Sequence, residues 1–270
     1  MALAETAYAK INLALHVRRR REDGYHELET LFAFVDDGDR LTASPASRDV
    51  VNVKGEFAGA LEDPFGNIVS KALNLFKHVP GWSVILEKNL PVAAGLGGGS
   101  ADAGAIIRMI EHWGTLPDDW RERAARLGAD VPACIESRTC IGRGTGTELE
   151  MVDSDLTGTA VLLVNPRQPL ATGPVFKAWD GVDRGPLPSG SVRAIALAGR
   201  NDLEAPAIGL CPVIADVLAA LDGTRPLLAR MSGSGATCFA LYESHDVMRE
   251  AAEGLASAHP GWWQMQGRLR

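Results

Sequence analysis

The sequence predicts an α+β protein made of two domains, and three observations support this prediction. The 270 residues exceed one typical domain and fall short of two large ones. Apolar residues near the N-terminus recur at the two-residue period of β-strands. In the second half, segments of strand-like and helix-like pattern alternate, which is typical of a layered α+β arrangement. We place the boundary near residue 150, giving domains over residues 1–150 and 151–270.

Composition places the chain among folded globular proteins. Hydrophobic residues make up 46% of the chain and charged residues 23%, which excludes a disordered or collagen-like protein. The 27 Lys and Arg residues against 34 Asp and Glu residues give a formal charge of −7, which argues against a surface for nucleic acid or membranes. No run approaches the roughly 18 apolar residues of a spanning helix, and no secretory signal is recognisable. We therefore expect a cytoplasmic protein.

The first element is predicted to be a β-strand. Apolar residues from Ala7 to Val17 occupy every second position, so Lys10, Asn12 and His16 share the opposite face. The arginine run Arg18–Arg21 follows, but an acidic residue pair and a glycine then turn the chain. We interpret the run as the solvated end of a hairpin. Further strands are expected over residues 26–36, near 50–53 and near 82–86, which predicts an antiparallel-rich sheet.

Helical spacing of apolar residues predicts helices over Asn67–Val79, Ser100–Trp113 and residues 118–127. The next segment, GADVPACIES, is expected to be a proline-containing loop that leads to an extended segment, and GRGTGTELE is expected to be a glycine-rich turn.

In the second half, residues 159–166 predict a buried strand, and Gly181–Gly199 is the least ordered-looking stretch. The remaining predicted elements are a helix over 211–221, strands over 227–231 and 237–242, a helix over 245–257 and a strand near Trp262. The four cysteines form no C-x-x-C pair and the six histidines lack metal-ligand spacing. We expect reduced, mostly buried thiols and no protein metal site.

The strongest functional signal is PVAAGLGGGSADAGA, residues 91–105. Four glycines in five positions precede Ser100, which is suited to cap an alanine-rich helix. Glycines let backbone amides approach phosphate oxygens, and a helix N-terminus adds about half a positive charge. The segment lacks the lysine of a P-loop, the third glycine of a dinucleotide-binding fingerprint and the last glycine of a nucleophile elbow. It therefore predicts a different kind of phosphate-binding loop.

This loop resembles the phosphate-binding motif of the GHMP small-molecule kinases. AYAKINLALHV and RREDGYHELETLF near the N-terminus, SGSGATCFALY at residues 232–242 and NDLE at residues 201–204 resemble one family of that superfamily, the 4-diphosphocytidyl-2-C-methyl-D-erythritol kinases. The resemblance extends from about residue 7 to residue 242. It implies a two-domain GHMP kinase fold, with a mixed-sheet N-terminal domain, a ferredoxin-like C-terminal α+β domain and an active site in the cleft between them.

The resemblance also implies an activity, namely transfer of the γ-phosphoryl group of ATP to the 2-hydroxyl of 4-diphosphocytidyl-2-C-methyl-D-erythritol in the non-mevalonate isoprenoid pathway. Lys10 and Asp130 match the catalytic pair, with Asp130 as general base and Lys10 activating the hydroxyl. Magnesium would be carried by ATP. The partners would be small molecules, with neither nucleic acid nor membrane, and the chain would be a monomer or homodimer. The expected ATP-binding residues are Pro91, Gly95, Leu96, Gly97, Gly98, Gly99, Ser100 and Ala101.

Four residues match the family's cytidine site: Asn12, Tyr25, His26 and Phe176. Tyr25 and Phe176 offer aromatic faces, and His26 offers polar atoms to the edge of the base. The turn Ser232, Gly233, Ser234, Gly235 is expected either to lie near the phosphates or to be a simple hairpin turn, and local sequence favours neither. Arg143 stands where this family commonly has an acidic residue, which leaves the role of its turn open.

Three other functions compete with this one. Another GHMP kinase, of the homoserine, mevalonate or phosphomevalonate type, is opposed by the DGYHEL segment. A nucleotide-binding protein without catalysis is opposed by the presence of both Lys10 and Asp130. A nucleic-acid-binding module rests on Arg18–Arg21 alone. Whether residues 181–199 close over the substrate is left open by the sequence.

Overall fold

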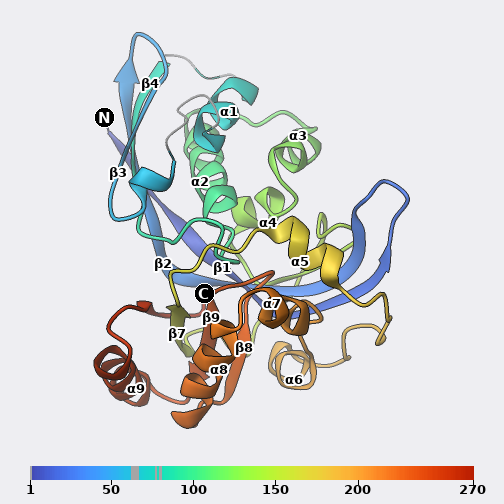
Figure 1. Cartoon of the computed structure of the whole chain (residues 1–270). Coiled ribbons are helices and arrows are strands. Elements are labelled where there is room, and N and C mark those ends of the chain that lie inside the picture. Colours follow the sequence, from blue (N-terminus) through green and yellow to red (C-terminus); the bar gives the residue numbers. More distant parts are fainter. Residues whose placement is uncertain (1, 62–66, 77, 79–80) are drawn as a thin grey trace. The chain divides into compact units, whose positions relative to one another are not determined.

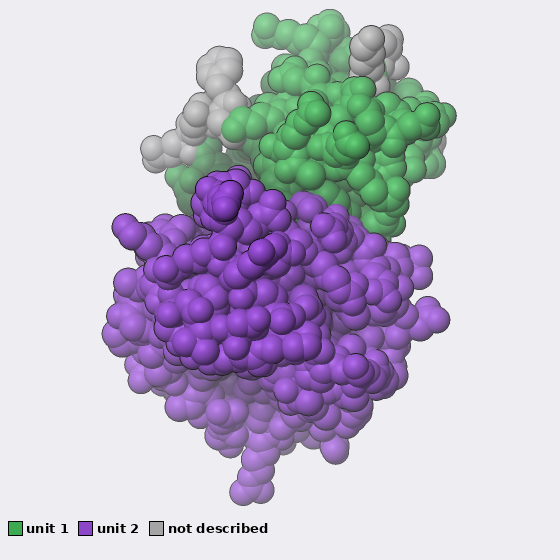
Figure 2. Space-filling model, turned by 90° about the vertical axis from the view of Figure 1, so that its right-hand side faces the viewer, with its two compact units in different colours: residues 1–10, 37–92, 97–137 green, residues 11–36, 93–96, 138–270 purple. Residues whose placement is uncertain are grey.

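The computed structural model describes residues 2–61, 67–76, 78 and 81–270 (Figure 1). Contacts divide the chain into two compact units, and each unit collects several separate segments (Figure 2). Unit 1 comprises residues 1–10, 37–92 and 97–137, and unit 2 comprises residues 11–36, 93–96 and 138–270. The chain therefore passes from one unit to the other within its first two strands and within the glycine-rich segment. The domain boundary at residue 150 and the cleft between domains stay predictions.

Two long strands open the fold, β1 (Leu3–Arg20) and β2 (His26–Ala46), and they pair with each other. In unit 1, the end of β2 pairs antiparallel with β4 (Gly81–Glu87), with Arg40 opposite Glu87. β4 pairs in parallel with β3 (Val50–Lys54). The strands predicted from alternation are confirmed, and the sheet is mixed. Gly24, in the turn after β1, has φ +87°, which a glycine adopts without the penalty that a Cβ brings.

The helices of unit 1 pack against one another. They are α1 (Ile68–Leu75), α2 (Gly98–Trp113), α3 (Trp120–Leu127) and α4 (Val131–Glu136), with a short 3₁₀ turn at Ala58–Ala60. A Cβ on Gly104 would lie 2.7 Å from the carbonyl of Cys134, so glycine is what lets α4 approach α2 this closely. The predicted helix Asn67–Val79 is present but ends at Leu75, and Val79 lies outside the described residues.

One expectation in unit 1 was wrong, because the segment expected to be a proline-containing loop forms α4. Pro132 lies in its first turn, where the missing N–H removes no intrahelical hydrogen bond. Val131, Cys134 and Ile135 are buried. Tertiary burial of this short helix therefore outweighs a local sequence that looks like a loop.

Unit 2 contains two groups of strands. β5 (Cys140–Arg143) and β6 (Glu148–Met151) form a hairpin around the glycine-rich turn expected at GRGTGTELE, and β5 pairs with residues 30–32 of β2. A second sheet is antiparallel throughout, in the order β10-β7-β9-β8. Its strands are β7 (Ala160–Asn165), β8 (Leu228–Met231), β9 (Cys238–Tyr242) and β10 (Trp263–Arg268). The helices of unit 2 are α5 (Thr172–Ala178), α6 (Val192–Ala198), α7 (Glu204–Leu210), α8 (Val213–Gly223) and α9 (His245–Ala258).

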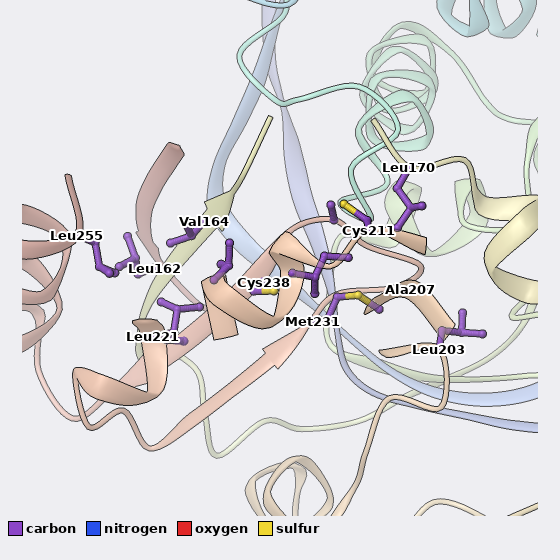
Figure 3. Close-up of a cluster of buried hydrophobic side chains, with 14 of the residues drawn as sticks. Leu162, Val164, Leu170, Leu203, Ala207, Cys211, Leu221, Met231, Cys238 and Leu255 are labelled. Atoms are coloured by element: carbon purple, nitrogen blue, oxygen red, sulfur yellow. The ribbon is translucent and has the colours of Figure 1, made fainter. Parts of the chain in front are cut away.

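The core of unit 2 lies between this second sheet and helices α8 and α9. Figure 3 shows Leu162 and Val164 of β7 in one cluster with Leu221 of α8 and Leu255 of α9. Burying a side chain of this size contributes about 1.5–3 kcal/mol relative to leaving it exposed. The α+β fold class predicted from the sequence is confirmed.

Gly181–Gly199 was expected to be the least ordered stretch, and this expectation was wrong for its C-terminal part, which forms α6. The Ser191 hydroxyl accepts a hydrogen bond from the Ala194 amide at the start of this helix, and Val192 and Ile195 are buried. Helices α5 and α7 also lie outside the predicted set. All four cysteines are free and buried, as expected. Within the described parts of the chain, no helix is long and apolar enough to cross a bilayer.

Candidate active site

The two side chains predicted to be catalytic meet in unit 1. Lys10 Nζ lies 3.0 Å from Asp130 Oδ2, and the lysine side chain is 4% exposed whereas the aspartate side chain is 32% exposed. Lys10 comes from β1 and Asp130 immediately precedes α4. Asp130 occupies the cap position of that helix, yet its side chain makes no capping hydrogen bond. A buried amine therefore lies beside a carboxylate that is open enough to reach a ligand.

The glycine-rich segment leads directly into α2. Gly97, at the cap position, has φ +61°, and the helix begins at Gly98. The expectation that Ser100 caps this helix was wrong, because Ser100 already lies inside the first turn and the cap uses no side chain. A left-handed glycine completes the turn earlier than a serine cap would. The Ala101 amide donates to the Gly97 carbonyl at 2.7 Å, so the amides of residues 98–100 precede the first intrahelical bond.

The glycines of this segment perform different tasks. In unit 1, a Cβ on Gly97 would lie 3.0 Å from Lys10 Cε, and a Cβ on Gly98 would lie 3.0 Å from Lys88 Nζ. A Cβ on Gly99 would meet only Ile68, at an ordinary 3.7 Å. Gly97 and Gly98 therefore leave room for buried lysines beneath the loop, a reason for glycine that the motif alone does not indicate.

In unit 2, the turn Ser232–Gly235 joins β8 to β9 and contacts residues 93–96. The Ser232 hydroxyl donates to the Gly95 carbonyl at 2.8 Å and accepts from the backbone N–H of Asn12 at 3.2 Å. A Cβ on Gly95 would lie 2.2 Å from the Ser232 carbonyl oxygen. The turn is a hairpin turn that also holds the start of the glycine-rich segment. Its contact with phosphate stays a prediction.

Asn12 is buried in unit 2. Its side-chain amide donates to the Thr30 hydroxyl at 2.7 Å, and that hydroxyl donates to the Ala14 carbonyl at 2.8 Å. This chain of hydrogen bonds fixes the Asn12 side chain between β1 and β2.

Two of the predicted cytidine residues, His26 and Phe176, form an aromatic cluster with Trp179 in unit 2. The His26 ring lies 5.0 Å from Phe176 and 5.8 Å from Trp179, measured between ring centroids. Tyr25 is 63% exposed. Among the described residues, His26 Nε2 and Trp179 Nε1 are buried without a hydrogen-bond partner. The hydrogen-bonding capacity of these two nitrogens is therefore unused within the described residues.

Burial, followed by the nearby Arg20 guanidinium, lowers the pKa of His26. The imidazole is therefore neutral at neutral pH, with one nitrogen that donates and one that accepts a hydrogen bond.

Trp179 was missed by sequence reasoning. Its position three residues after Phe176, at the end of α5, is the signal that indicates a shared helix face.

Polar residues of the NDLE segment hold the site's framework rather than facing a ligand. The Asn201 side-chain amide donates to the carbonyls of Met231 and Gly233, both at 2.8 Å. Asp202 accepts from the Val17 amide of β1 at 2.8 Å. Arg230, also missed by sequence reasoning, is buried, and its guanidinium donates to the Leu13 carbonyl.

Arg143, in the turn whose role the sequence left open, is exposed and pairs with Glu150 at 2.6 Å across the β5–β6 hairpin.

Comparison with known proteins places this geometry in a family. Two family models match the chain, GHMP kinases N terminal domain over residues 67–138 and GHMP kinases C terminal over residues 191–261. A 4-diphosphocytidyl-2-C-methyl-D-erythritol kinase of Novosphingobium aromaticivorans is 68% identical over 270 residues, covering 100% of this chain and 94% of that protein. The chain belongs to the 4-diphosphocytidyl-2-C-methyl-D-erythritol kinase family. It is an ATP-dependent small-molecule kinase.

A further relative and two solved structures agree with this assignment or with the fold. A relative of the same name from Erythrobacter litoralis is 61% identical, covering 99% of this chain and 100% of that protein. A solved 4-(cytidine 5'-diphospho)-2C-methyl-D-erythritol kinase is 33% identical with a TM-score of 0.82, covering 99% of each chain. A homoserine kinase from Cytophaga hutchinsonii, 16% identical with a TM-score of 0.70 over 99% of this chain and 95% of that one, is similar in fold alone.

Proposed function

We propose that this kinase transfers the γ-phosphoryl group of ATP to the 2-hydroxyl of 4-diphosphocytidyl-2-C-methyl-D-erythritol. The observation that carries the chemistry is the contact of Lys10 with Asp130 at 3.0 Å, directly beneath Gly97 of the glycine-rich segment. The names of the relatives that match nearly the whole chain support the acceptor.

Phosphoryl transfer requires alignment, charge neutralisation and an acceptor for the hydroxyl proton. In the proposed step, Asp130 takes the proton of the 2-hydroxyl while the oxygen bonds to the γ-phosphorus. The bond from the γ-phosphorus to the β–γ bridging oxygen breaks, and ADP leaves with that electron pair. Lys10 stabilises the negative charge that develops on the attacking oxygen. ATP enters as its magnesium complex, and the amides at the start of α2 receive its phosphates.

Recognition of the cytidine is proposed to involve unit 2. Neutral His26 matches the donor and acceptor pattern of the cytosine edge, and Phe176 and Tyr25 offer faces for stacking. The buried, unpartnered nitrogen of Trp179 adds a second donor beside His26.

A coupled assay of ADP release tests the proposal. We expect magnesium-dependent turnover with 4-diphosphocytidyl-2-C-methyl-D-erythritol and none above background with homoserine, mevalonate or phosphomevalonate. Comparable rates with these other alcohols would contradict the proposed acceptor. ATP binding without turnover of any acceptor would instead support a nucleotide-binding protein.

A further inference from the structure

Three charged side chains meet in the interior of unit 1, beneath the start of α2. They are Asp39 of β2, Lys88 just after β4, and Asp102 of α2, and each is at most 2% exposed. Lys88 Nζ donates to Asp39 Oδ2 and to Asp102 Oδ2, the latter at 2.8 Å. We call these three residues the buried triad. It lies beneath Gly98, whereas Lys10 lies beneath Gly97, and it takes no part in the proposed chemistry.

The triad connects the backbone just before the glycine-rich segment with the start of α2 inside that segment. The second oxygen of Asp39 accepts from the amides of Asn89 and Leu90 at 2.6 and 2.8 Å, immediately before the segment begins. On the other side, Lys88 Nζ lies 3.0 Å from the position of a Cβ on Gly98, the first residue of α2. The lysine amine is therefore in contact with the turn of helix whose amides precede the first intrahelical bond.

The charges of the triad balance only when one carboxyl group keeps its proton. Burial raises the pKa of Asp102 to about 8, with Lys88 opposing this shift and Asp39 adding to it. Burial lowers the pKa of Lys88, but the two carboxyl groups outweigh this and the net pKa is raised. The raised pKa of Asp102 favours its neutral form, and among the described residues its Oδ1 has no hydrogen-bond partner.

Stability alone does not account for this arrangement. The desolvation of buried ions offsets most of their attraction, and apolar residues of similar volume frequently stabilise a core equally well. The hydrogen bonds of the triad are directional, whereas apolar packing is not. Each bond fixes the distance and angle between specific atoms of β2, α2 and the chain before Pro91.

We propose that Lys88 is a positioning residue for ATP, which acts through Asp102 and Asp39 to hold the first turn of α2 where its amides receive the phosphates. This inference rests on the proposed function. The hydrogen bonds of the triad join Asp102 of α2 to Lys88, and Asp39 to the backbone just before the glycine-rich segment. Loosening the triad therefore affects ATP binding more than binding of the cytidine substrate.

Two variants of similar size test the proposal. Asp102→Leu removes the hydrogen bond to Lys88, whereas Asp102→Asn keeps an oxygen that accepts it, and neither introduced side chain carries a charge. We expect the Kd for ATP, measured by calorimetry, to be about tenfold higher in Asp102→Leu than in Asp102→Asn, which corresponds to about 1.4 kcal/mol. The KM for the cytidine substrate should differ between the two by less than twofold.

A second variant covers the case in which Asp102→Leu fails to fold. The double variant Lys88→Met with Asp39→Asn removes one positive and one negative charge together, so no unpaired ion stays buried. The amide oxygen of the introduced asparagine still accepts from the two backbone amides. We expect a folded protein with an ATP Kd raised about tenfold. Lys54→Met is the control, because Lys54 forms an exposed ion pair with Glu87 on the same sheet.

The proposal is overturned if folded Asp102→Leu and the double variant both bind ATP within twofold of the Lys54→Met control. It is also overturned if the Kd for ATP and the KM for the cytidine substrate both rise in proportion to the fall in the thermal unfolding midpoint. A purely structural role predicts that result. Failure of the proposed function is a separate result, since an enzyme that does not phosphorylate the cytidine substrate still reports its ATP affinity by calorimetry.

Discussion

Gly97 offers a sharp test of how the glycine-rich segment and the catalytic pair depend on each other. The residue has φ +61°, and a Cβ there would lie 3.0 Å from Lys10 Cε. Gly97→Ala therefore causes two separate effects. It places a side chain in a left-handed conformation, and it pushes against the lysine that contacts Asp130.

The size of each effect follows from the geometry. A non-glycine residue in the left-handed region costs about 1–2 kcal/mol of stability. Ordinary Cβ contacts lie at 3.4–4 Å, so the Lys10 Cε must withdraw by about 0.4–1.0 Å from its present 3.0 Å. Misplacement of a catalytic group by about 1 Å can lower a rate by about 10²-fold. We therefore expect kcat to fall by about 10- to 100-fold.

Gly158→Ala is the matched control. Gly158 also has a left-handed φ, +83°, but a Cβ there would meet nothing within 4 Å. Urea unfolding should show a similar loss of stability in both variants, whereas the ADP-release assay should show a lowered kcat in Gly97→Ala only. If Gly97→Ala retains the kcat of Gly158→Ala, the close approach of Gly97 to Lys10 has no catalytic consequence and the reasoning is wrong.

Three further predictions concern the roles proposed for single side chains. Asp130→Asn keeps the size of the residue but removes the proton acceptor, so kcat should fall by about 10²-fold or more with little change in the KM for ATP; near-normal kcat would remove Asp130 from catalysis. Tyr25→Ala should raise the KM for the cytidine substrate by about 5- to 150-fold, as expected for a stacking contribution of about 1–3 kcal/mol, and a change within twofold would place the base elsewhere. Because the pKa of His26 is lowered by burial and by Arg20, the KM for the cytidine substrate should rise only at a pH more acidic than that at which an ordinary imidazole titrates, as protonation removes the acceptor nitrogen. His26→Asn should abolish this rise, and a rise that persists in the variant would assign it to another group.

The sequence alone predicted most of the regular elements, and the exceptions share a cause. Alternation over residues 7–17 and helical spacing over residues 100–113 identified β1 and α2, because period is a local property of the chain. Around Pro132 the local pattern was typical of a loop. The helix forms there because its apolar residues are buried against α2, which lies well before α4 in the sequence. A pattern read from neighbouring residues alone does not include that contact.

The candidate site shows the same division. The motif identified Gly97 and Gly98 as members of a phosphate-binding loop, yet the sequence did not indicate that lysines lie beneath both of them. Ser100 has the residue type of a helix cap, but a left-handed glycine three positions earlier starts the helix first. Trp179 beside His26 was missed because its contact depends on how α5 packs.

The sequence by itself determined those features that depend on neighbouring residues: the period of the strands and helices, the glycine turn at Gly24 and the run of small residues that starts α2. Only the tertiary structure decided which distant side chains meet. Lys10 contacts Asp130, and Lys88 lies between Asp39 and Asp102. The physical reason is that burial brings together charges from separate strands and helices, and their pairing depends on packed distances that residue type and spacing along the chain do not encode.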